Sequence, residues 1–319
     1  RHGFDSYYGM PYSNYMEIQY AQDSYPPLPL LRDEEVIQAQ PDQSSITERY
    51  VEESVRFLRA NRERPFFLYF AHMYVHLPIY PPDRFLRESE NGVYGAAVQA
   101  IDWSLSVLRY ELKRLGLEEN TLIIFTSDNG SRARDEGGSN DPLRGYKGTT
   151  WEGGQRVPCI MHWPGQIPAG TVCHEVATAM DLCPTLAALG GAPMPTNRII
   201  DGKDIRPLMQ AEPDARSPHE SFFYYVMHNL MAVRVGKWKL HVKRMTFPDM
   251  AITPARELYD LDADIGETTN LYDQHPEVVA ELEAKLAACR QDLGDKSSGV
   301  VGQHVRPVGR VDNPDTLTH

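Results

Sequence analysis

The sequence has few cysteines and no long apolar run. Its four cysteines, Cys159, Cys173, Cys183 and Cys289, are irregularly spaced among 319 residues. They show neither the paired spacing of a zinc site nor the density of a disulfide framework, so neither class is predicted. No apolar stretch approaches the roughly 18 residues of a transmembrane helix, and no membrane span is predicted.

Positive charge is also scarce. The chain has 44 Asp and Glu against 32 Lys and Arg, which gives a formal net charge of −12. A nucleic-acid partner is disfavoured because phosphate binding requires a basic face. An anionic small molecule would have to be attracted locally, against the field of the whole chain. With 41% hydrophobic residues, the chain is long enough for one large core and a smaller one.

The most informative segment is an apolar run that ends in oxygen-bearing side chains, Thr121-Leu-Ile-Ile-Phe-Thr-Ser-Asp-Asn-Gly130. If the run is a strand of an open α/β sheet, Asp128 and Asn129 lie at its carboxyl end, where ligands bind. Carboxylate and amide oxygens suit a hard divalent cation such as Ca²⁺ or Mg²⁺ better than Zn²⁺. Taken alone, Asp-Asn-Gly is more often a turn than a metal site.

A glycine-rich segment follows, Lys147-Gly-Thr-Thr-Trp-Glu-Gly-Gly154. A lysine held in such a turn is able to bind an anion beside the cation, although a lysine before glycine is usually only solvated. Cation and lysine together favour an anionic substrate. The glycines are expected to serve a tight backbone fold, Thr149 to Trp151 to pack, and Arg156 to form a structural ion pair.

Apolar periodicity predicts alternating helices and strands in the first two thirds of the chain. Ser45-Ile-Thr-Glu48 fits a capping box ahead of a helix, and the leucine-rich run from Val98 to Leu115 is a helix that stops at Gly116. The expected strands are Phe66–Ala71, 121–127 and Val157–Trp163, and a further helix is Met180–Leu189. A strand, a helix and a strand with a crossover of this length predict parallel neighbours.

The sequence pattern changes after Ser221, from alternating helices and strands to consecutive strands. Three strand candidates, Phe222–Val226, Leu230–Val242 and Arg256–Leu261, precede a helix at Pro276–Leu293. This order predicts a small antiparallel sheet covered by a terminal helix. We therefore expect a core domain at 1–216, a small α+β subdomain at 217–294 and a surface tail at 295–319.

The order of motifs resembles the formylglycine-dependent sulfatases of the alkaline phosphatase superfamily. The resemblance covers nearly the whole chain and implies an α/β, alkaline-phosphatase-like fold with a mixed, mostly parallel sheet flanked by helices. Its landmarks, besides the two segments above, are Arg1–Ser13, Pro65–Pro78, Trp163–Pro168, Asp201–Leu208, Val235–Leu240 and Glu257–Asp262 with Asn270-Leu271.

The resemblance also implies the roles of individual residues. His76 is expected to hydrogen-bond the sulfate ester and help protonate the leaving oxygen, and Lys147 to contact a sulfate oxygen. Asp128 and Asn129 are expected to bind Ca²⁺, with Mg²⁺ less favoured, and Asp128 to orient the formylglycine diol. His72 competes with His76, but only His76 has the x-Pro context of the family's histidine. His72 is expected to be a hydrogen-bonded core residue.

The family's nucleophile segment is missing. Sulfatases carry Cys-x-Pro-x-Arg or Ser-x-Pro-x-Arg, whose first residue becomes formylglycine, and no cysteine or serine here has that context. The chain begins at Arg1 rather than Met, at a point that matches the middle of a sulfatase domain. We therefore predict an amino-terminally truncated sulfatase, with formylglycine in an upstream segment and no activity of the chain alone.

Two other functions remain open: a phosphate or phosphonate ester hydrolase of the same superfamily, and a non-catalytic domain. The Lys147–Gly154 segment and the His-Leu-Pro context favour the sulfatase. The substrate is expected to be a sulfated carbohydrate or, second, an aryl or alkyl sulfate, bound by loops at Asn14–Arg32, Ser131–Asp141, Met227–Asn229 and Lys243–Pro254. The resemblance implies an extracytoplasmic location.

Overall fold

The computed structural model describes residues 3–18, 25–246 and 249–312. Parts of the expected rim loops at 14–32 and 243–254, and the end of the expected tail at 295–319, lie outside the described residues. The chain forms two compact units, residues 1–121 with 134–138 and 310–319, and residues 122–133 with 139–309. The predicted domain boundaries at 216 and 294 both fall inside the second unit.

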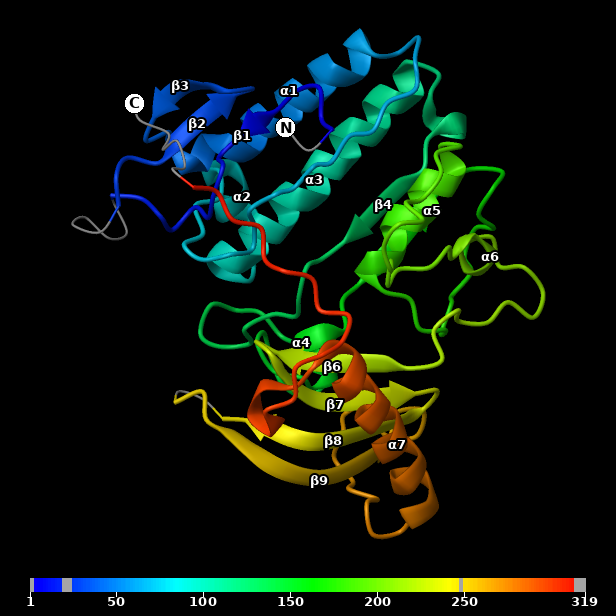
Figure 1. Cartoon of the computed structure of the whole chain (residues 1–319). Coiled ribbons are helices and arrows are strands. Elements are labelled where there is room, and N and C mark those ends of the chain that lie inside the picture. The colour runs from blue at the N-terminus through cyan, green and yellow to red at the C-terminus, as the bar shows by residue number, and fades with distance from the viewer. Residues whose placement is uncertain (1–2, 19–24, 247–248, 313–319) are drawn as a thin grey trace. The chain divides into compact units, whose positions relative to one another are not determined.

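The first unit is built around two packed helices, α1 and α3 (Figure 1). One face of α3 is lined by small and apolar residues such as Ala97, Ala100 and Leu108, which are buried, so that α1 can pack closely against it. The elements of this unit are β1 Tyr8–Gly9, β2 Pro29–Arg32, β3 Glu35–Ala39, η1 Gln43–Ser45, α1 Ile46–Ala60, α2 Asp83–Glu88, α3 Gly92–Arg114 and η2 Glu118–Asn120. Strands β1, β2 and β3 form an antiparallel sheet in that order.

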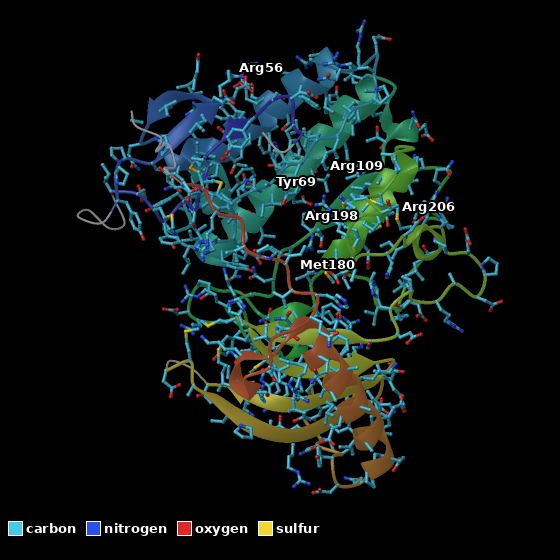
Figure 2. The ribbon with its side chains drawn as sticks, viewed as in Figure 1. Arg56, Tyr69, Arg109, Met180, Arg198 and Arg206 are labelled. Carbon is cyan, nitrogen blue, oxygen red and sulfur yellow. The ribbon has the colours of Figure 1, made fainter. Side chains whose placement is uncertain are left out.

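Two local predictions for this unit fail. Ser45 precedes α1, but its hydroxyl donates to the Asp42 carbonyl (2.7 Å), so the capping box does not form. Ser45 is instead the last residue of a 3₁₀ turn that precedes the helix. No strand is assigned to the expected Phe66–Ala71 segment. Phe67 and Tyr69, the latter labelled in Figure 2, are 60% and 70% exposed. A β-prone run becomes a strand only when a neighbouring strand pairs with it.

The second unit contains two sheets. In the smaller one, β4 Ile123–Thr126 pairs with β5 Cys159–His162, and Ile123 lies opposite His162. Both strands were predicted, but they are antiparallel, and the predicted parallel neighbour of β4 is not found among the described residues. Short helices complete this part: α4 Glu152–Gln155, η3 Ala179–Asp181, α5 Leu182–Leu189 and α6 Arg206–Met209.

The larger sheet is antiparallel, in the order β6 Phe222–Val226, β7 Asn229–Val235, β8 Trp238–Met245 and β9 Ile252–Asp260. Helix α7, Pro276–Leu293, packs on it and was predicted with these bounds (Figure 1). The predicted strand Leu230–Val242 is in fact two strands joined by a turn at Gly236 and Lys237. The core between sheet and helix comprises Leu230, Val233, Leu240, Leu258, Val279, Leu282, Leu286 and Cys289.

The predicted surface tail begins with a buried anchor. Asp295 is 1% exposed and accepts hydrogen bonds from the Leu230 backbone N–H (3.3 Å) and from Lys243 Nζ (2.6 and 2.7 Å). Arg290 Nε also donates to it, at 3.2 Å. Burial raises the pKa of the Asp295 carboxyl, but the attraction of Lys243 and hydrogen bonds from Lys243, Ser298 and Ser297 outweigh it and hold the pKa well below its usual range. The segment that includes η4, Lys296–Ser298, is thus fastened to the sheet and to α7.

Candidate active site

Asp128 and Asn129 follow the end of β4, as the sequence predicted. Asp128 is exposed, and the amide nitrogen of Asn129 donates to its carboxylate. The Ser127 hydroxyl donates to the Asn129 carbonyl at 3.1 Å and closes the turn. The strand therefore presents a carboxylate and an amide side by side.

Backbone hydrogen bonds join this turn to the segment of Lys147. The Gly130 N–H donates to the Gly154 carbonyl (3.2 Å), and the Lys147 N–H donates to the Ser131 carbonyl (3.0 Å). Asp128, Asn129 and Lys147 thus belong to two chain segments that are hydrogen-bonded to each other. The roles of these three residues, and the convergence of their side chains, stay a prediction.

Asn140 reinforces the junction and was not anticipated from the sequence. Its side-chain oxygen accepts from the Ser131 N–H (2.8 Å), and its nitrogen donates to the carbonyls of Ser131 (2.9 Å) and Gly145 (3.0 Å). An asparagine with one acceptor and two donors satisfies three backbone groups of two segments. An isolated loop asparagine carries no sequence signal of this role.

Glycine is required where the two segments meet. A Cβ on Gly130 would lie 1.8 Å from the Gly153 carbonyl oxygen, and one on Gly153 would lie 2.6 Å from the carbonyl oxygens of Arg144 and Gly145. Any side chain would force the backbones apart. The sequence predicted that the glycines of the Lys147–Gly154 segment serve a tight backbone fold, and this is confirmed for Gly153.

A buried network of charges underlies the Lys147–Gly154 segment. Lys239 on β8 is 0% exposed, and its Nζ lies 2.8 Å from Glu152 Oε1 and 3.0 Å from Glu267 Oε1. The other Glu267 oxygen accepts from the Glu152 backbone N–H at 2.7 Å. His241 Nε2 lies 3.0 Å from Glu267 Oε1. The network links the predicted substrate-binding loop to the C-terminal sheet.

The charges of this network are balanced by their partners. Burial raises the pKa of Glu152, but the attraction and hydrogen bond of Lys239 outweigh it, so that the pKa is lowered overall. Burial lowers the pKa of His241 to about 4, with Glu267 opposing the shift. His241 is therefore neutral near pH 7. Lys239 is shared by two carboxylates, and Arg234 approaches Glu152 at 3.5 Å.

Neighbouring residues pack as predicted. Thr149, Thr150 and Trp151 are buried, and the Trp151 ring lies 4.3 Å from the His241 ring, centroid to centroid. Arg156 forms the expected ion pair, with 3.9 Å between its guanidinium and Glu152. Thr149, Thr150 and Trp151 therefore support the loop from within.

His72 and His76, both in the first unit, have different surroundings. The Tyr74 backbone N–H donates to His72 Nδ1 (3.0 Å), so the proton of the neutral ring is on Nε2, which lies 3.0 Å from the Thr47 hydroxyl. Burial lowers the pKa of His72 to about 4. His72 is a neutral structural residue.

His76 is exposed and oriented by two contacts. Its Nδ1 lies 2.7 Å from the Leu77 carbonyl, so Nδ1 carries the proton that is donated, and its ring stacks on Tyr15 at 5.8 Å. Nε2 is then an acceptor in the neutral ring and a donor in the protonated ring. His76 belongs to the first unit and Lys147 to the second. Their convergence on one site remains a prediction.

The residues after β4 fit a hard cation in kind but not in number. Asp128 and Asn129 offer the oxygen ligands that Ca²⁺ prefers, but Ca²⁺ takes six to eight. The described residues contain no cluster of three or more His, Cys, Asp or Glu side chains suited to a metal.

The chain belongs to the sulfatase family. Residues 1–192 match the sequence model of the family described as Sulfatase, and residues 146–292 match that of N-sulphoglucosamine sulphohydrolase, C-terminal. The chain is 36% identical to mouse N-acetylgalactosamine-6-sulfatase over 292 residues, 87% of this chain and 55% of the relative. It is 34% identical to mouse steryl-sulfatase over 310 residues, 86% of this chain and 50% of the relative. The chain thus spans about half the length of these curated relatives.

Solved structures give the same family and fold. The PsFucS1 sulfatase from Pseudoalteromonas sp. superposes with a TM-score of 0.78 at 27% identity, over 90% of this chain and 66% of that one. The predicted alkaline-phosphatase-like α/β fold and the sulfatase resemblance are confirmed. Within the described residues, no helix has the length and apolar character needed to cross a bilayer.

Proposed function

We propose that the protein carrying this chain is a sulfuric-ester hydrolase that releases inorganic sulfate. The observation that carries the proposal is the hydrogen-bonded pair of segments that presents Asp128, Asn129 and Lys147 in a member of the sulfatase family. The chain contributes residues that bind the ester and stabilise charge, and the nucleophile, formylglycine, is expected from a segment outside it.

Lys147 and His76 act on the ester oxygens. Lys147 is a half-buried residue whose backbone N–H is hydrogen-bonded to Ser131, and its ammonium is proposed to contact a sulfate oxygen and stabilise negative charge as the S–O bond breaks. His76, with Nδ1 bonded to the Leu77 carbonyl, offers Nε2–H to the leaving oxygen when protonated. Proton transfer from Nε2 would release the alcohol in neutral form.

Asp128 and Asn129 are proposed as two ligands of a divalent cation, with Ca²⁺ preferred over Mg²⁺. When bound, the cation offsets the negative charge that otherwise opposes attack on an anionic ester. Because two side chains are too few for tight binding, the chain alone is expected to hold Ca²⁺ weakly. Calorimetric detection of tight Ca²⁺ binding by the 319-residue chain would contradict this assignment.

The substrate proposed first is a sulfated carbohydrate, and an aryl or alkyl sulfate is second. Support comes from relatives named for both kinds, an N-acetylgalactosamine-6-sulfatase and a steryl-sulfatase. An extracytoplasmic location is proposed from the family resemblance alone. A phosphate ester hydrolase is the competing function, and the assay below separates the two.

The test compares the 319-residue chain with the same chain extended by its natural upstream segment and matured to formylglycine. The extended form is expected to hydrolyse an aryl sulfate in preference to the matching aryl phosphate. The chain alone is expected to be silent, because its sequence has no Cys-x-Pro-x-Arg or Ser-x-Pro-x-Arg to supply the nucleophile. Preference for the phosphate ester, or sulfate release by the chain alone, would sink the proposal.

Within the extended form, Lys147→Ala is expected to lower kcat/KM for the aryl sulfate by about 10²–10³, the usual cost of removing a preorganised charge donor. Lys113→Ala is the matched control, because Lys113 is an exposed lysine in the last turn of α3. It should leave kcat/KM unchanged. An equal loss in both variants would show that Lys147 acts only through net charge.

A further inference from the structure

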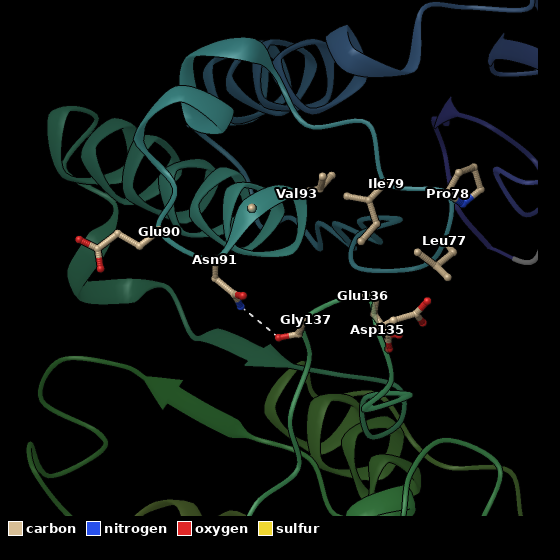
Figure 3. Close-up of a pocket in the computed structure, with 10 residues that line it drawn as sticks. Leu77, Pro78, Ile79, Glu90, Asn91, Val93, Asp135, Glu136 and Gly137 are labelled. Carbon is tan, nitrogen blue, oxygen red and sulfur yellow. Dashed lines mark hydrogen bonds between the residues drawn. The ribbon is translucent and has the colours of Figure 1, made fainter.

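The first unit contains a cavity of about 610 Å³, and its lining includes Leu77, the residue that follows His76 in the sequence (Figure 3). It is lined by residues 77–79, by residues 90–93 at the start of α3, and by residues 135–137. All three segments belong to the first unit. The volume lies within the roughly 300–1,000 Å³ of small-molecule sites and accommodates a sugar residue.

One wall of the cavity is apolar. Leu77, Pro78 and Ile79 form it together with Val93 of α3, and Figure 3 shows Leu77 and Ile79 across from the loop at 135–137. Asn91 fastens that loop to the start of α3, since its side-chain nitrogen donates to the Gly137 carbonyl at 3.0 Å. The two walls are therefore tied to each other by a hydrogen bond before any ligand binds.

The other lining groups are acidic. The lining includes the carboxylates of Glu90, Asp135 and Glu136 and no lysine or arginine. Glu136 Oε2 is buried and has no hydrogen-bond partner among the described residues. The carboxylate of Asp135, which is exposed, is available to a ligand hydroxyl. The apolar wall suits the C–H face of a sugar ring, and the acidic wall suits its hydroxyl groups.

We propose that this cavity binds an uncharged, hydroxyl-rich sugar residue next to the sulfated one, and that it rejects a residue bearing a carboxylate or a second sulfate. The assignment rests on the proposed function in one respect: Leu77 adjoins His76, so a sugar bound here is a neighbour of the ester held by His76. The substrate class is then a saccharide with a single sulfate and no other charge nearby. Like charges in a shared site oppose binding, whereas hydroxyl donors pair with the carboxylates.

The test uses the 319-residue chain and unsulfated disaccharides, so that no catalysis is needed. Saturation-transfer NMR at pH 7 would compare cellobiose with cellobiouronic acid, in which a carboxylate replaces one hydroxymethyl group. Cellobiose is expected to bind at least about tenfold more tightly. Glu136→Gln and Asp135→Asn should narrow that difference, and the control Glu119→Gln, an exposed carboxylate remote in sequence from the lining residues, should leave it unchanged.

A blocking variant separates this cavity from other surfaces. Val93 is 44% exposed in the first turn of α3, so Val93→Trp is expected to fill the cavity and abolish cellobiose binding while the thermal unfolding midpoint stays near that of the parent chain. Equal or tighter binding of the uronic acid, absence of cellobiose binding by the parent chain, or cellobiose binding retained by a folded Val93→Trp variant would each overturn the proposal. None of these results depends on sulfate release, so a failure here and a failure of the proposed function are distinguishable.

Discussion

A histidine packs beside each of two segments, the half-buried His72 in the segment of His76 and the buried His241 beneath the segment of Lys147, and the partners of the two histidines differ. His72 contacts the hydroxyl of Thr47 and the backbone N–H of Tyr74, both uncharged. His241 contacts Glu267, which also binds Lys239. Burial lowers the pKa of both imidazoles to about 4, so each is neutral near pH 7.

The difference concerns how each segment fails. A buried neutral histidine is destabilised when its ring gains a proton, because the new charge has no counterion there. A buried ion network is destabilised when one charge is removed, because the remaining charges stay buried without a counterion. We therefore expect the Lys147 segment to be the more sensitive of the two to single substitutions, whereas both segments should lose stability in acid because both histidines are neutral in the folded chain.

The largest effect is expected for Lys239→Ala. The substitution leaves the carboxylates of Glu152 and Glu267 buried and close together, which should cost about 3–5 kcal/mol in the free energy of unfolding. Urea unfolding of the 319-residue chain measures it. Lys237→Ala is the matched control, because the side chain of Lys237 is 45% exposed in its ion pair with Asp260, and its cost should be below about 1 kcal/mol. Similar losses in both variants would contradict a special role of the buried network.

This network marks the limit of what the sequence predicts. The motif around Lys239 was recognised only as a family landmark, and its partner Glu152 is 87 residues away along the chain. Periodicity identifies helices such as α3, since it is local, but pairing between distant charges depends on how the sheet folds back. The same reason explains the segment at 66–71, whose β-prone composition does not reveal whether a partner strand exists.

Local motifs were predicted better. The position of Asp128 and Asn129 at the end of β4 follows from the apolar run before them. Asn140, which bridges Ser131 and Gly145, was missed because its role depends on three-dimensional contacts alone. The sequence thus indicated where the candidate site residues lie along the chain, whereas the residues that hold them in place required the structure.

The second effect is an acid sensitivity of the first unit. The pKa of His72 is about 4 in the folded chain and near 6.5 when the chain is unfolded. Because the folded value is the lower one, stability is complete above about pH 6.5 and falls as the pH decreases from 6.5 towards 4. The loss attributable to His72 is roughly 3 kcal/mol, at about 1.4 kcal/mol per pKa unit.

Unfolding free energies measured from pH 7.5 to pH 4 test this expectation. His72→Gln should lower the slope of the unfolding free energy against pH by the equivalent of about one proton. His174→Gln, at an exposed position, should leave that slope unchanged. His241 contributes a similar dependence in the second unit, so the parent curve should keep part of its slope in His72→Gln. An unchanged slope would show that His72 is not a buried neutral group.

The smallest effect is expected for Thr47→Val. Thr47 is 0% exposed, and its hydroxyl accepts the proton of His72 Nε2 at 3.0 Å. Valine has nearly the same shape, so the loss should reflect the hydrogen bonds of the hydroxyl, to His72 and to the Tyr74 side chain, about 1–2 kcal/mol. Thr171→Val, at an exposed position, should change stability by less than about 0.5 kcal/mol. A double-mutant cycle with His72→Gln sharpens the result, because the cost of Thr47→Val should shrink once the imidazole is gone. If the two costs simply add, the hydrogen bond does not hold His72, and the contrast between a neutral and a charged support is lost.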